Sequence, residues 1–537
     1  MTVGLKEILA VLENPMLDGD LSVEISGASH DSRKIRPGWL FVAMAGENSD
    51  GHDFIAQAIH AGASAVIAEK ARAEIFEPVP WIRVPDSRSA LGPVAALLNG
   101  RPTTKMVLVG ITGTNGKTTL TFLLEAMVKA AGGKPGVIGT ISYRWGNGGE
   151  LNAVHTTPEA SDLQFLFKEM VEAGVTHTFI EVSSHGLHRG RLLGCEFDLG
   201  VFTNLTQDHL DYHGNLEDYY LAKQTLFTKL LPASSKKDAT AVVNLDDPYG
   251  RRLALETESL PVMGYGLAPD CEIHPTAVTV TANGISATVS TPRGQIAIFS
   301  RLTGSFNLMN ILAAIAVAEK LGIPSDAVQK GIEAVDAIPG RLERVLSKSG
   351  TIFVDYAHTP HALKNVLEAL KIIRTDRIIT VMGCGGDRDK TKRPLMGMEA
   401  AAGSDFVIVT SDNPRSEDPL DIIRQVEEGV RSYGFTRCSK VLNGQPLKSR
   451  CYNVIPDRRD AITWAVNHLK GGDILLVAGK GHETYQEIKG VRYPFDDREV
   501  LREELKRRAA LRQGPVECSP LVDNAEHPHR ESGRTGQ

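Results

Sequence analysis

One loop of the chain has the residue types and the spacing of a phosphate-binding site. Residues 110–118 read Gly-Ile-Thr-Gly-Thr-Asn-Gly-Lys-Thr and lie between an apolar, strand-like segment and a helical pattern. Glycines let backbone N–H groups surround phosphate oxygens, the lysine supplies a point charge, and the threonine hydroxyl can join a Mg²⁺ shell. A plain glycine-rich turn explains the Lys-Thr ending less well. The predicted ATP-binding residues here are Gly113, Thr114, Asn115, Gly116, Lys117, Thr118 and Thr119.

Two other polar groups follow apolar segments and suit a metal ion. Glu181 stands at the end of such a segment, where its carboxylate could hold Mg²⁺ opposite Thr118; by residue type alone it fits a structural ion pair equally well. The run 203–213 contains two aspartates and two histidines within six residues. Caps and surface loops also use these residues, so the run indicates a metal site only in combination with the phosphate loop.

The composition is that of a multidomain globular protein. The chain has 537 residues, of which 42% are apolar and 23% charged, and three domains are expected. The formal net charge of −6 provides no field that would recruit nucleic acid or an anionic membrane. We therefore expect no nucleic acid and no membrane partner. Small-molecule substrates and a monomer are further predictions that do not follow from the charge.

Cysteine usage and the N-terminal segment indicate a cytoplasmic location. The six cysteines are scattered without a Cys-x-x-Cys pair, which argues against a disulfide framework or a zinc knuckle. The N-terminus lacks a charged region followed by an apolar one, and no run of about 18 apolar residues occurs. These features predict a soluble, unexported protein in a reducing cytosol.

Strands alternate with helical patterns in two separate series, which predicts an α/β protein with parallel sheets. Turn-forming residues near 99–102 and 338–340 separate the parts of the chain. Ligand sites of such sheets lie at the carboxyl ends of the strands. The expected strands are 106–111, 178–182, 201–202 and 240–243 in the first series, and 351–354, 378–382, 406–410 and 474–478 in the second. The expected domains are 1–103, 104–338 and 339–510, with 511–537 as a disordered tail.

A set of motifs in a fixed order resembles the Mur ligases of peptidoglycan synthesis. The motifs are residues 113–119, 181–185, 203–213, 222–223, 304–307, 339–341 and 355–360. The resemblance extends from Asp31-Ser32-Arg33 to about Glu483, and within the family it is greatest to the branch that adds the third residue of the stem peptide. Chance agreement of so many ordered motifs is negligible.

The resemblance implies three α/β domains: an N-terminal UDP-binding domain, a central P-loop ATPase domain with a mostly parallel sheet, and a C-terminal Rossmann-like domain that presents the amino acid. By resemblance, the uridine diphosphate contacts are Ser32, Glu47, Asn48 and Ser49. The contacts to the muramoyl-dipeptide arm are Thr156, Thr157, Ser183, Arg189 and Arg191. Arg189 stands where relatives often carry Gln, so its contact is expected to differ. The residues expected to meet ATP from across the cleft are Asn307, Arg341 and Asp355.

The resemblance also implies a Mg²⁺ site made of Thr118, Glu181, His209 and Lys223, and a catalytic set of Lys117, Glu181, His209 and Lys223. Lys223 would be carbamylated by CO₂ and would then serve as an anionic ligand. A bare ammonium beside Mg²⁺ would be repelled by roughly a few kcal/mol, so the carbamate makes chemical sense there. Without the resemblance, Lys223 is best interpreted as a surface lysine on a helix spanning 219–227.

The added amino acid is predicted from the Asp-Asn-Pro-Arg sequence at 412–415, which resembles the version of this branch that uses meso-diaminopimelate rather than L-lysine. A guanidinium fork matches the additional carboxylate of diaminopimelate, and Glu483 would pair with its distal ammonium. On its own, the sequence is an ordinary turn after a strand. The expected diaminopimelate pocket comprises Arg388, Asp412, Asn413, Pro414, Arg415, Gly479 and Glu483.

The predicted reaction forms an acyl phosphate from ATP and the D-Glu γ-carboxylate of UDP-MurNAc-L-Ala-D-Glu, which the amine of diaminopimelate then attacks. Three alternatives remain open. One is the L-lysine-adding version, the second is a folylpolyglutamate synthetase-like ligase, and the third is a nucleotide-gated binding protein that makes no bond. The stretch 436–456 is expected to be longer than in relatives and has no assigned role.

Overall fold

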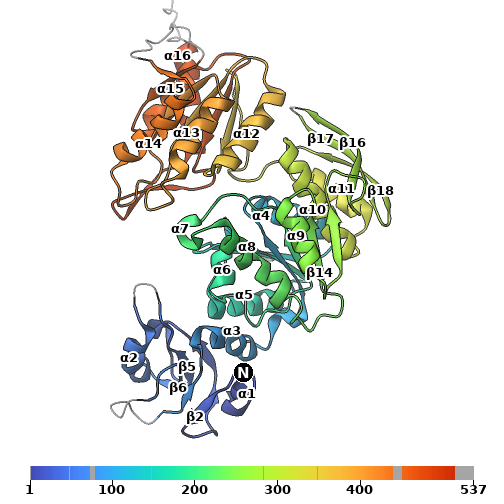
Figure 1. The fold of residues 1–537 in the computed structure, drawn as a ribbon, viewed down its shortest axis with the longest axis vertical. Helices are drawn as coiled ribbons and strands as arrows, with labels where there is room; N and C mark the ends of the chain where they lie inside the picture. The colour runs from blue at the N-terminus through green and yellow to red at the C-terminus, as the bar shows by residue number, and fades with distance from the viewer. Residues whose placement is uncertain are drawn as a thin grey trace, which may run out of the picture.

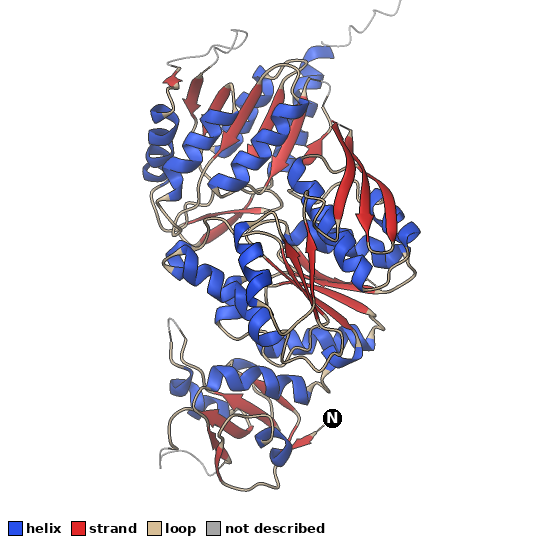
Figure 2. Ribbon diagram, turned by 45° about the vertical axis from the view of Figure 1, so that its right-hand side comes forward, coloured by secondary structure: helices blue, strands red, loops and turns tan. Residues whose placement is uncertain are grey.

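The structure, a computed structural model, describes residues 2–46, 49–72, 79–146, 148–281, 283–347, 349–438 and 450–513. Figure 1 shows three lobes along the long axis of the molecule, with the N-terminal lobe at one end, the P-loop lobe in the middle and the C-terminal lobe at the other end. Figure 2 shows that sheets and helices are layered in each lobe. No helix within the described ranges has both the length and the apolar character needed to cross a bilayer.

The N-terminal lobe contains a five-stranded sheet in the order β2-β7-β6-β5-β4, parallel except for β2. Its strands are β2 (Met16–Asp18), β4 (Gly27–Ser29), β5 (Trp39–Val42), β6 (Ala63–Ala68) and β7 (Trp81–Arg83), and a separate pair is formed by β1 (Val3–Gly4) and β3 (Glu24–Ile25). One face packs against α1 (Leu5–Leu9) and α3 (Ser87–Leu98), and the other against α2 (Ile55–His60). Short 3-10 turns occupy Ser32–Lys34, Gly51–Phe54 and Pro102–Lys105.

The central lobe is built on an eight-stranded sheet in the order β11-β10-β9-β12-β8-β13-β14-β15, in which only β10 runs antiparallel to the other strands. The strands are β8 (Val107–Thr112), β9 (Pro135–Ile138), β10 (Ser142–Trp145), β11 (Gly149–Asn152), β12 (His177–Glu181), β13 (Leu199–Phe202), β14 (Thr240–Asn244) and β15 (Val262–Tyr265). A three-stranded antiparallel sheet follows, made of β16 (His274–Thr281), β17 (Gly284–Thr291) and β18 (Gly294–Ser300).

Helices cover both faces of the central sheet and complete two apolar cores. One face packs against α4 (Lys117–Ala130), α10 (Ser305–Lys320) and α11 (Ser325–Glu333). The other packs against α5 (Ala160–Glu172) and α8 (Leu216–Thr225), which continues as a π-helical turn over Leu226–Leu230. The remaining helices are α6 (Ser184–His188), α7 (Leu210–His213) and α9 (Pro248–Glu256). With both faces covered, polar side chains are left to gather at the strand ends.

The C-terminal lobe has a seven-stranded sheet in the order β19-β20-β25-β21-β22-β24-β23, parallel except for β19. Its strands are β19 (Glu343–Val345), β20 (Thr351–Asp355), β21 (Ile378–Met382), β22 (Phe406–Val409), β23 (Thr436–Arg437), β24 (Cys451–Val454) and β25 (Ile474–Ala478), and a hairpin joins β26 (Tyr485–Ile488) to β27 (Val491–Pro494). The covering helices are α12 (Pro360–Ile373), α13 (Lys392–Gly403) and α14 (Pro419–Ser432) on one face, and α15 (Arg458–His468) and α16 (Asp497–Gln513) on the other.

The predicted α/β architecture with mostly parallel sheets is confirmed, and each predicted strand corresponds to an observed one within a few residues. Polar residues cap the helices that follow these strands: Ser183 before α6 and Thr359 before α12, for example, each accept a backbone N–H from the first helical turn. The sheet β16–β18 was not predicted. Of the predicted tail, Gln513 still belongs to α16 and residues 514–537 lie outside the described residues, as do 439–449 of the 436–456 stretch.

Candidate active site

The predicted phosphate loop joins β8 to α4, and its two glycines meet backbone requirements. Gly113 has a φ of 143° and Gly116 a φ of 91°, both in the region that favours glycine. A Cβ on Gly113 would lie 1.9 Å from Oγ1 of Thr203, so the loop touches the end of the neighbouring strand β13. Asn204, also at that end, accepts the backbone N–H of Asn115 at 3.0 Å. The sheet therefore fixes the loop from the side.

The Lys117 ammonium lies against this loop and donates to the carbonyl oxygens of Gly113 at 2.7 Å and Thr114 at 2.9 Å. Burial lowers the pKa of Lys117, while the carboxylates of Glu181 and Asp208 act in the opposite direction. A cation held among backbone dipoles and close to two carboxylates is suited to an anionic ligand that brings several oxygens.

Glu181, at the end of β12, is buried and joins the loop through side-chain contacts. Its Oε2 accepts hydrogen bonds from Oγ1 of Thr118 at 3.1 Å and Oγ1 of Thr140 at 2.9 Å, and its Oε1 accepts the backbone N–H of Thr140. The structure thus brings the hydroxyl and the carboxylate predicted for Mg²⁺ into contact across 63 residues of sequence. Thr140 was missed because nothing in its own segment marks it.

The 203–213 run contributes a second polar group. His209 has a left-handed backbone (φ 54°), and its Nε2 lies 3.4 Å from Oδ2 of Asp208, which is also 3.9 Å from Nε2 of His358 in the C-terminal lobe. Burial, together with the charges of Lys223 and Lys117, lowers the pKa of His209 to about 4 against the opposing effect of Asp208. His209 is therefore a neutral imidazole at pH 7, the form that can ligate a metal.

Lys223 is not a surface residue. It is 1% exposed on α8, and its Nζ donates to the carbonyl oxygen of Gly113 at 3.0 Å and lies 4.6 Å from the centre of the Tyr219 ring. Burial, reinforced by the charge of Lys117, lowers the pKa of Lys223 well below its ordinary value. The side chain thus favours the neutral amine, which is the nucleophilic form.

Four of the residues predicted for the muramoyl-dipeptide arm, Thr156, Thr157, Ser183 and Arg191, form one hydrogen-bonded group beside Glu181. Oγ1 of Thr157 donates to the Glu181 carbonyl at 2.9 Å and lies 3.0 Å from Oγ of Ser183. Arg191 donates to the carbonyl of Thr157 at 2.9 Å and pairs with Glu159 at 2.5 Å. Oγ1 of Thr156 lies 3.1 Å from Oγ1 of Thr140, and Arg189 contacts the hydroxyl of Tyr212 at 3.3 Å.

The predicted uridine diphosphate residues belong to the N-terminal lobe. Ser32 is buried, and its hydroxyl donates to Oε1 of Gln57 at 3.1 Å. The carbonyl of Ser49 accepts the N–H of Gly46, whereas Glu47 and Asn48 lie outside the described residues. An exposed ion pair between Lys34 and Asp162 at 2.8 Å links this lobe to the central one.

Arg341 brings the C-terminal lobe to the phosphate loop. Its Nη2 lies 3.4 Å from Oγ1 of Thr118, and its guanidinium stacks 4.6 Å from the centre of the Tyr356 ring. Asp355 is buried and accepts the backbone N–H groups of Leu342 and Ala357 at 2.6 and 2.7 Å, and burial raises its pKa. Two lobes therefore share one polar site at the carboxyl ends of their sheets.

Asn307 is connected to the same site by Asn310, a residue that was not predicted from the sequence. Asn307 is buried on α10, and its Oδ1 accepts a hydrogen bond from Asn310 at 3.2 Å. A Cβ on Gly116 would lie 2.3 Å from Oδ1 of Asn310, so α10 presses directly on the phosphate loop. The helical spacing of three residues was the available signal.

The predicted diaminopimelate residues lie after the carboxyl ends of β22 and β25, except for Arg388, which follows β21. Nδ2 of Asn413 donates to Oε2 of Glu483 at 2.7 Å, and a Cβ on Gly479 would lie 3.1 Å from Oδ2 of Asp412. Lys480, which was not among the predicted site residues, is completely buried, and its Nζ lies 3.0 Å from Oδ1 of Asn413 and 3.0 Å from Oε2 of Glu483.

Arg415 lies at the other end of the same turn in a left-handed conformation (φ 51°), after Pro414. Its Nη1 donates to the Gly386 carbonyl at 2.6 Å, which places it against the loop that carries Arg388. Arg388 itself is exposed and donates to the carbonyl of Asp387 at 2.9 Å. The two predicted arginines thus occupy adjacent loops, one packed and one open to solvent.

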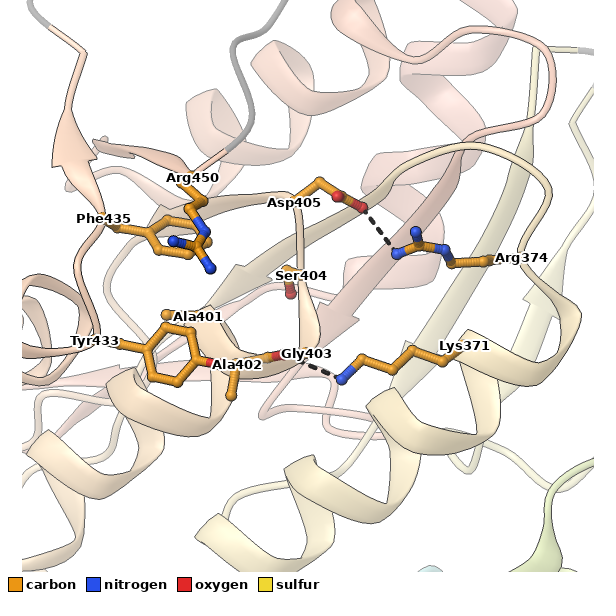
Figure 3. Close-up of a pocket in the computed structure, with 10 residues that line it drawn as sticks. All are labelled: Lys371, Arg374, Ala401, Ala402, Gly403, Ser404, Asp405, Tyr433, Phe435 and Arg450. Carbon is orange, nitrogen blue, oxygen red and sulfur yellow. Dashed lines mark hydrogen bonds and ion pairs between the residues drawn. The ribbon is translucent and has the colours of Figure 1, made fainter.

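A hollow of about 260 Å³ lies at the opposite, amino-terminal edge of this sheet. Figure 3 shows Arg374 directed at Asp405 and Lys371 directed at the backbone beside Gly403. The hollow shares no residue with the predicted site and is separate from it.

Within the described residues, no group of three or more histidine, cysteine, aspartate or glutamate side chains is gathered as a preformed metal centre. The oxygens of Thr118 and Glu181 are nevertheless the donor types that Mg²⁺ prefers, and this ion usually completes its shell with water and phosphate oxygens. The residues present therefore fit a Mg²⁺ site whose remaining ligands come from the phosphates of the bound nucleotide and from water.

Family models match three consecutive parts of the chain. The model described as Mur ligase family, catalytic domain, matches residues 24–97; Mur ligase middle domain matches 111–318; and Mur ligase, glutamate ligase domain, matches 340–481. The chain belongs to the Mur ligase family. The resemblance found in the motifs is thereby confirmed.

Nearly the whole length of this Mur ligase is similar to proteins that share the same enzyme name. It is 46% identical over 514 residues to the UDP-N-acetylmuramoyl-L-alanyl-D-glutamate--2,6-diaminopimelate ligase of Geobacter metallireducens, covering 95% of this chain and 100% of that one. A solved structure of a ligase of the same name matches with a TM-score of 0.66 and 32% identity over 95% and 100% of the two chains. The folylpolyglutamate synthase of Mycobacterium tuberculosis, solved with ADP and AMPPCP, matches with a TM-score of 0.58 at 20% identity over 73% and 92%, a likeness of fold alone.

Proposed function

We propose that this Mur ligase joins meso-diaminopimelate to UDP-MurNAc-L-Ala-D-Glu, using ATP to activate the D-Glu γ-carboxylate as an acyl phosphate. One structural observation carries the proposal: the Arg415 guanidinium and the buried Asp412 stand on one turn, and Asn413 of that turn is hydrogen-bonded to Glu483 of the loop after β25. Relatives with this activity in their name cover almost the whole chain, which supports the same assignment.

The first step places the ATP triphosphate on the phosphate loop, where backbone N–H groups and Lys117 receive its oxygens. Arg341 adds a second cation from the C-terminal lobe, 3.4 Å from the Thr118 hydroxyl. The substrate carboxylate attacks the γ-phosphorus, the bond to the β-phosphate oxygen breaks, and ADP leaves. Positive charge on both sides of the transferred group stabilises the charge that spreads over its oxygens.

Mg²⁺ would be held by Thr118, Glu181, His209 and a carbamylated Lys223. When bound, it would neutralise phosphate charge and align the reacting oxygens. Carbamylation follows from the surroundings of Lys223: the neutral amine attacks CO₂, an N–C bond forms, and a proton leaves to give a carbamate anion. That anion would also relieve the burial of an amine beside the ammonium of Lys117.

In the second step the amine of diaminopimelate attacks the acyl carbon, passes through a tetrahedral intermediate and expels phosphate. Arg415 would grip the distal carboxylate, which L-lysine lacks, and Glu483 would receive the distal ammonium. Arg388 is exposed beside this turn and would complete the carboxylate contact from the adjacent loop. Closure of the lobes would keep water from the acyl phosphate.

The N-terminal lobe would bind the uridine diphosphate end through Ser32 and the 47–49 loop, and Thr156, Thr157, Ser183 and Arg191 would hold the dipeptide arm. Arg189, stacked on Tyr212, would meet this arm differently from the usual Gln. We propose domains with the limits 1–103, 104–338 and 339–510, and a monomer that works in the cytoplasm on small-molecule substrates, without nucleic acid or membrane partners.

The proposal is tested by measuring ADP release with UDP-MurNAc-L-Ala-D-Glu and either meso-diaminopimelate or L-lysine. Release that requires both the nucleotide substrate and diaminopimelate supports it. Equal use of L-lysine would point to the lysine-adding version, and activity on a folate with glutamate would point to the folylpolyglutamate synthetase-like alternative. ADP release without any new bond would identify a nucleotide-gated binding protein.

A further inference from the structure

Lys480 is a completely buried lysine at the centre of the predicted diaminopimelate pocket. Its Nζ donates to Oδ1 of Asn413 and to Oε2 of Glu483, each at 3.0 Å, and lies 3.5 Å from Oδ1 of Asp412. A buried ammonium is stable only when it is paired and hydrogen-bonded. Lys480 is therefore held by both acids of the pocket at once.

The charges of this group do not cancel. Asp412 and Glu483 carry two carboxylates against the single ammonium of Lys480, with side chains at most 16% exposed. Two further cations of this lobe are paired with other carboxylates: Arg458 forms two hydrogen bonds with Asp497, and Arg415 lies 4.0 Å from Glu487. Burial and the charge of Asp412 raise the pKa of Glu483, and Lys480 opposes that rise. One negative charge is left over.

The Asp412–Glu483 pair also contains one buried oxygen that accepts no hydrogen bond from the residues described. Oε2 of Glu483 is occupied by Asn413 and Lys480. Oδ1 of Asp412, by contrast, is buried and accepts no hydrogen bond from the residues described. A buried carboxylate oxygen without a donor is costly, so a ligand donor there would be favoured.

We propose that Lys480 is a fixed counter-ion that leaves the Asp412–Glu483 pair with one net negative charge, and so matches the pocket to an amino acid whose far end carries one ammonium. This inference rests on the proposed function and deepens it. Without Lys480 the two carboxylates would repel each other and would no longer present Asp412 Oδ1 as a single ordered acceptor. Lys480 is thus a positioning residue, because it acts through the two acids.

The test is a charge-compensation experiment on the full-length enzyme. Lys480→Met leaves two negative charges and should raise the KM for diaminopimelate at least tenfold, while the KM values for ATP and UDP-MurNAc-L-Ala-D-Glu stay within threefold. Glu483→Gln leaves the pocket with no net charge and should also raise the KM for diaminopimelate at least tenfold. The double variant restores one negative charge on Asp412 and should have a KM at least tenfold below that of Lys480→Met. A double variant as poor as either single variant, or poorer, overturns the proposal, since a purely structural role of Lys480 gives additive damage.

A second measurement keeps the inference testable if Lys480→Met does not fold. 2-Aminopimelate has the distal carboxylate of diaminopimelate but not its distal ammonium. In Glu483→Gln, the affinity for diaminopimelate relative to 2-aminopimelate should fall at least tenfold from the wild-type ratio, and an unchanged ratio overturns the proposal. Wild-type enzyme that cannot use diaminopimelate refutes the proposed function itself. Wild-type use of diaminopimelate without these shifts instead refutes the role of Lys480 and the contact assigned to Glu483.

Discussion

Lys223→Ala is the substitution that most directly probes the chemistry of the phosphate loop. It removes a buried amine that lies 3.0 Å from the Gly113 carbonyl, where a carbamate would face the bound cation. Removing one partner of a buried charge pair costs roughly 3 to 5 kcal/mol. If that loss appears in the transition state, the rate falls by roughly two to four orders of magnitude, at about 1.4 kcal/mol per factor of ten.

The assay is ADP release at saturating substrates, with Lys229→Ala as the matched control. Lys229 is exposed on the adjoining helical turn, so its loss should change the rate less than twofold. Formate or acetate should partly restore the Lys223→Ala rate, because a free carboxylate can enter the space that the side chain vacates. Labelled bicarbonate should give a carbamate signal in wild-type protein that is absent from the variant. Full activity of Lys223→Ala would refute the reasoning.

Three other outcomes are expected. Arg415→Ala should lower the preference for diaminopimelate over L-lysine by roughly ten- to a hundredfold, since a hydrogen bond to a charged group contributes roughly 1.5–3 kcal/mol. Competition assays with both amino acids measure this preference, and an unchanged preference excludes the contact of Arg415 with the distal carboxylate. Hydrogen bonding to Arg393 lowers the pKa of Glu417 from 4.5 to about 2, so this pair stabilises the fold fully above pH 4.5 and loses that effect as the pH falls toward 2. The difference in urea midpoint between wild type and Glu417→Gln should therefore be greatest above pH 5 and narrow at pH 3, and a constant difference contradicts the assignment. Gly113→Ala should abolish ATP binding measured by calorimetry, because the new Cβ would lie 1.9 Å from Thr203; retained affinity would show that the loop tolerates a side chain.

The fold was predictable because each buried strand of a parallel sheet can be recognised from its own run of apolar residues. Strands buried on both faces are apolar runs, and those at 107–112 and 378–382 stand out for that reason. The antiparallel sheet β16–β18 was missed because its strands are partly exposed and interrupted by polar residues, as at His274–Thr281. Alternation of this kind is weak evidence until the neighbouring strands are known.

The site was predictable where a residue belongs to a motif, and not where it acts through contacts with distant segments. Thr118 and Glu181 were predicted together and lie 3.1 Å apart. Thr140 contacts the same carboxylate, yet its surroundings in the sequence are those of an ordinary strand end. Lys480 was passed over because lysines are usually exposed, and only the three-dimensional structure places it between two acids.

The central claim is that one molecule unites a triphosphate, an activated carboxylate and the amine of diaminopimelate. Positional isotope transfer tests it most directly: UDP-MurNAc-L-Ala-D-Glu labelled with ¹⁸O in the γ-carboxylate is incubated with ATP and meso-diaminopimelate, and the released phosphate is analysed by mass spectrometry. An acyl phosphate intermediate requires one labelled oxygen in each phosphate released with product. Phosphate that carries no label, alongside formation of the amide, would contradict the account.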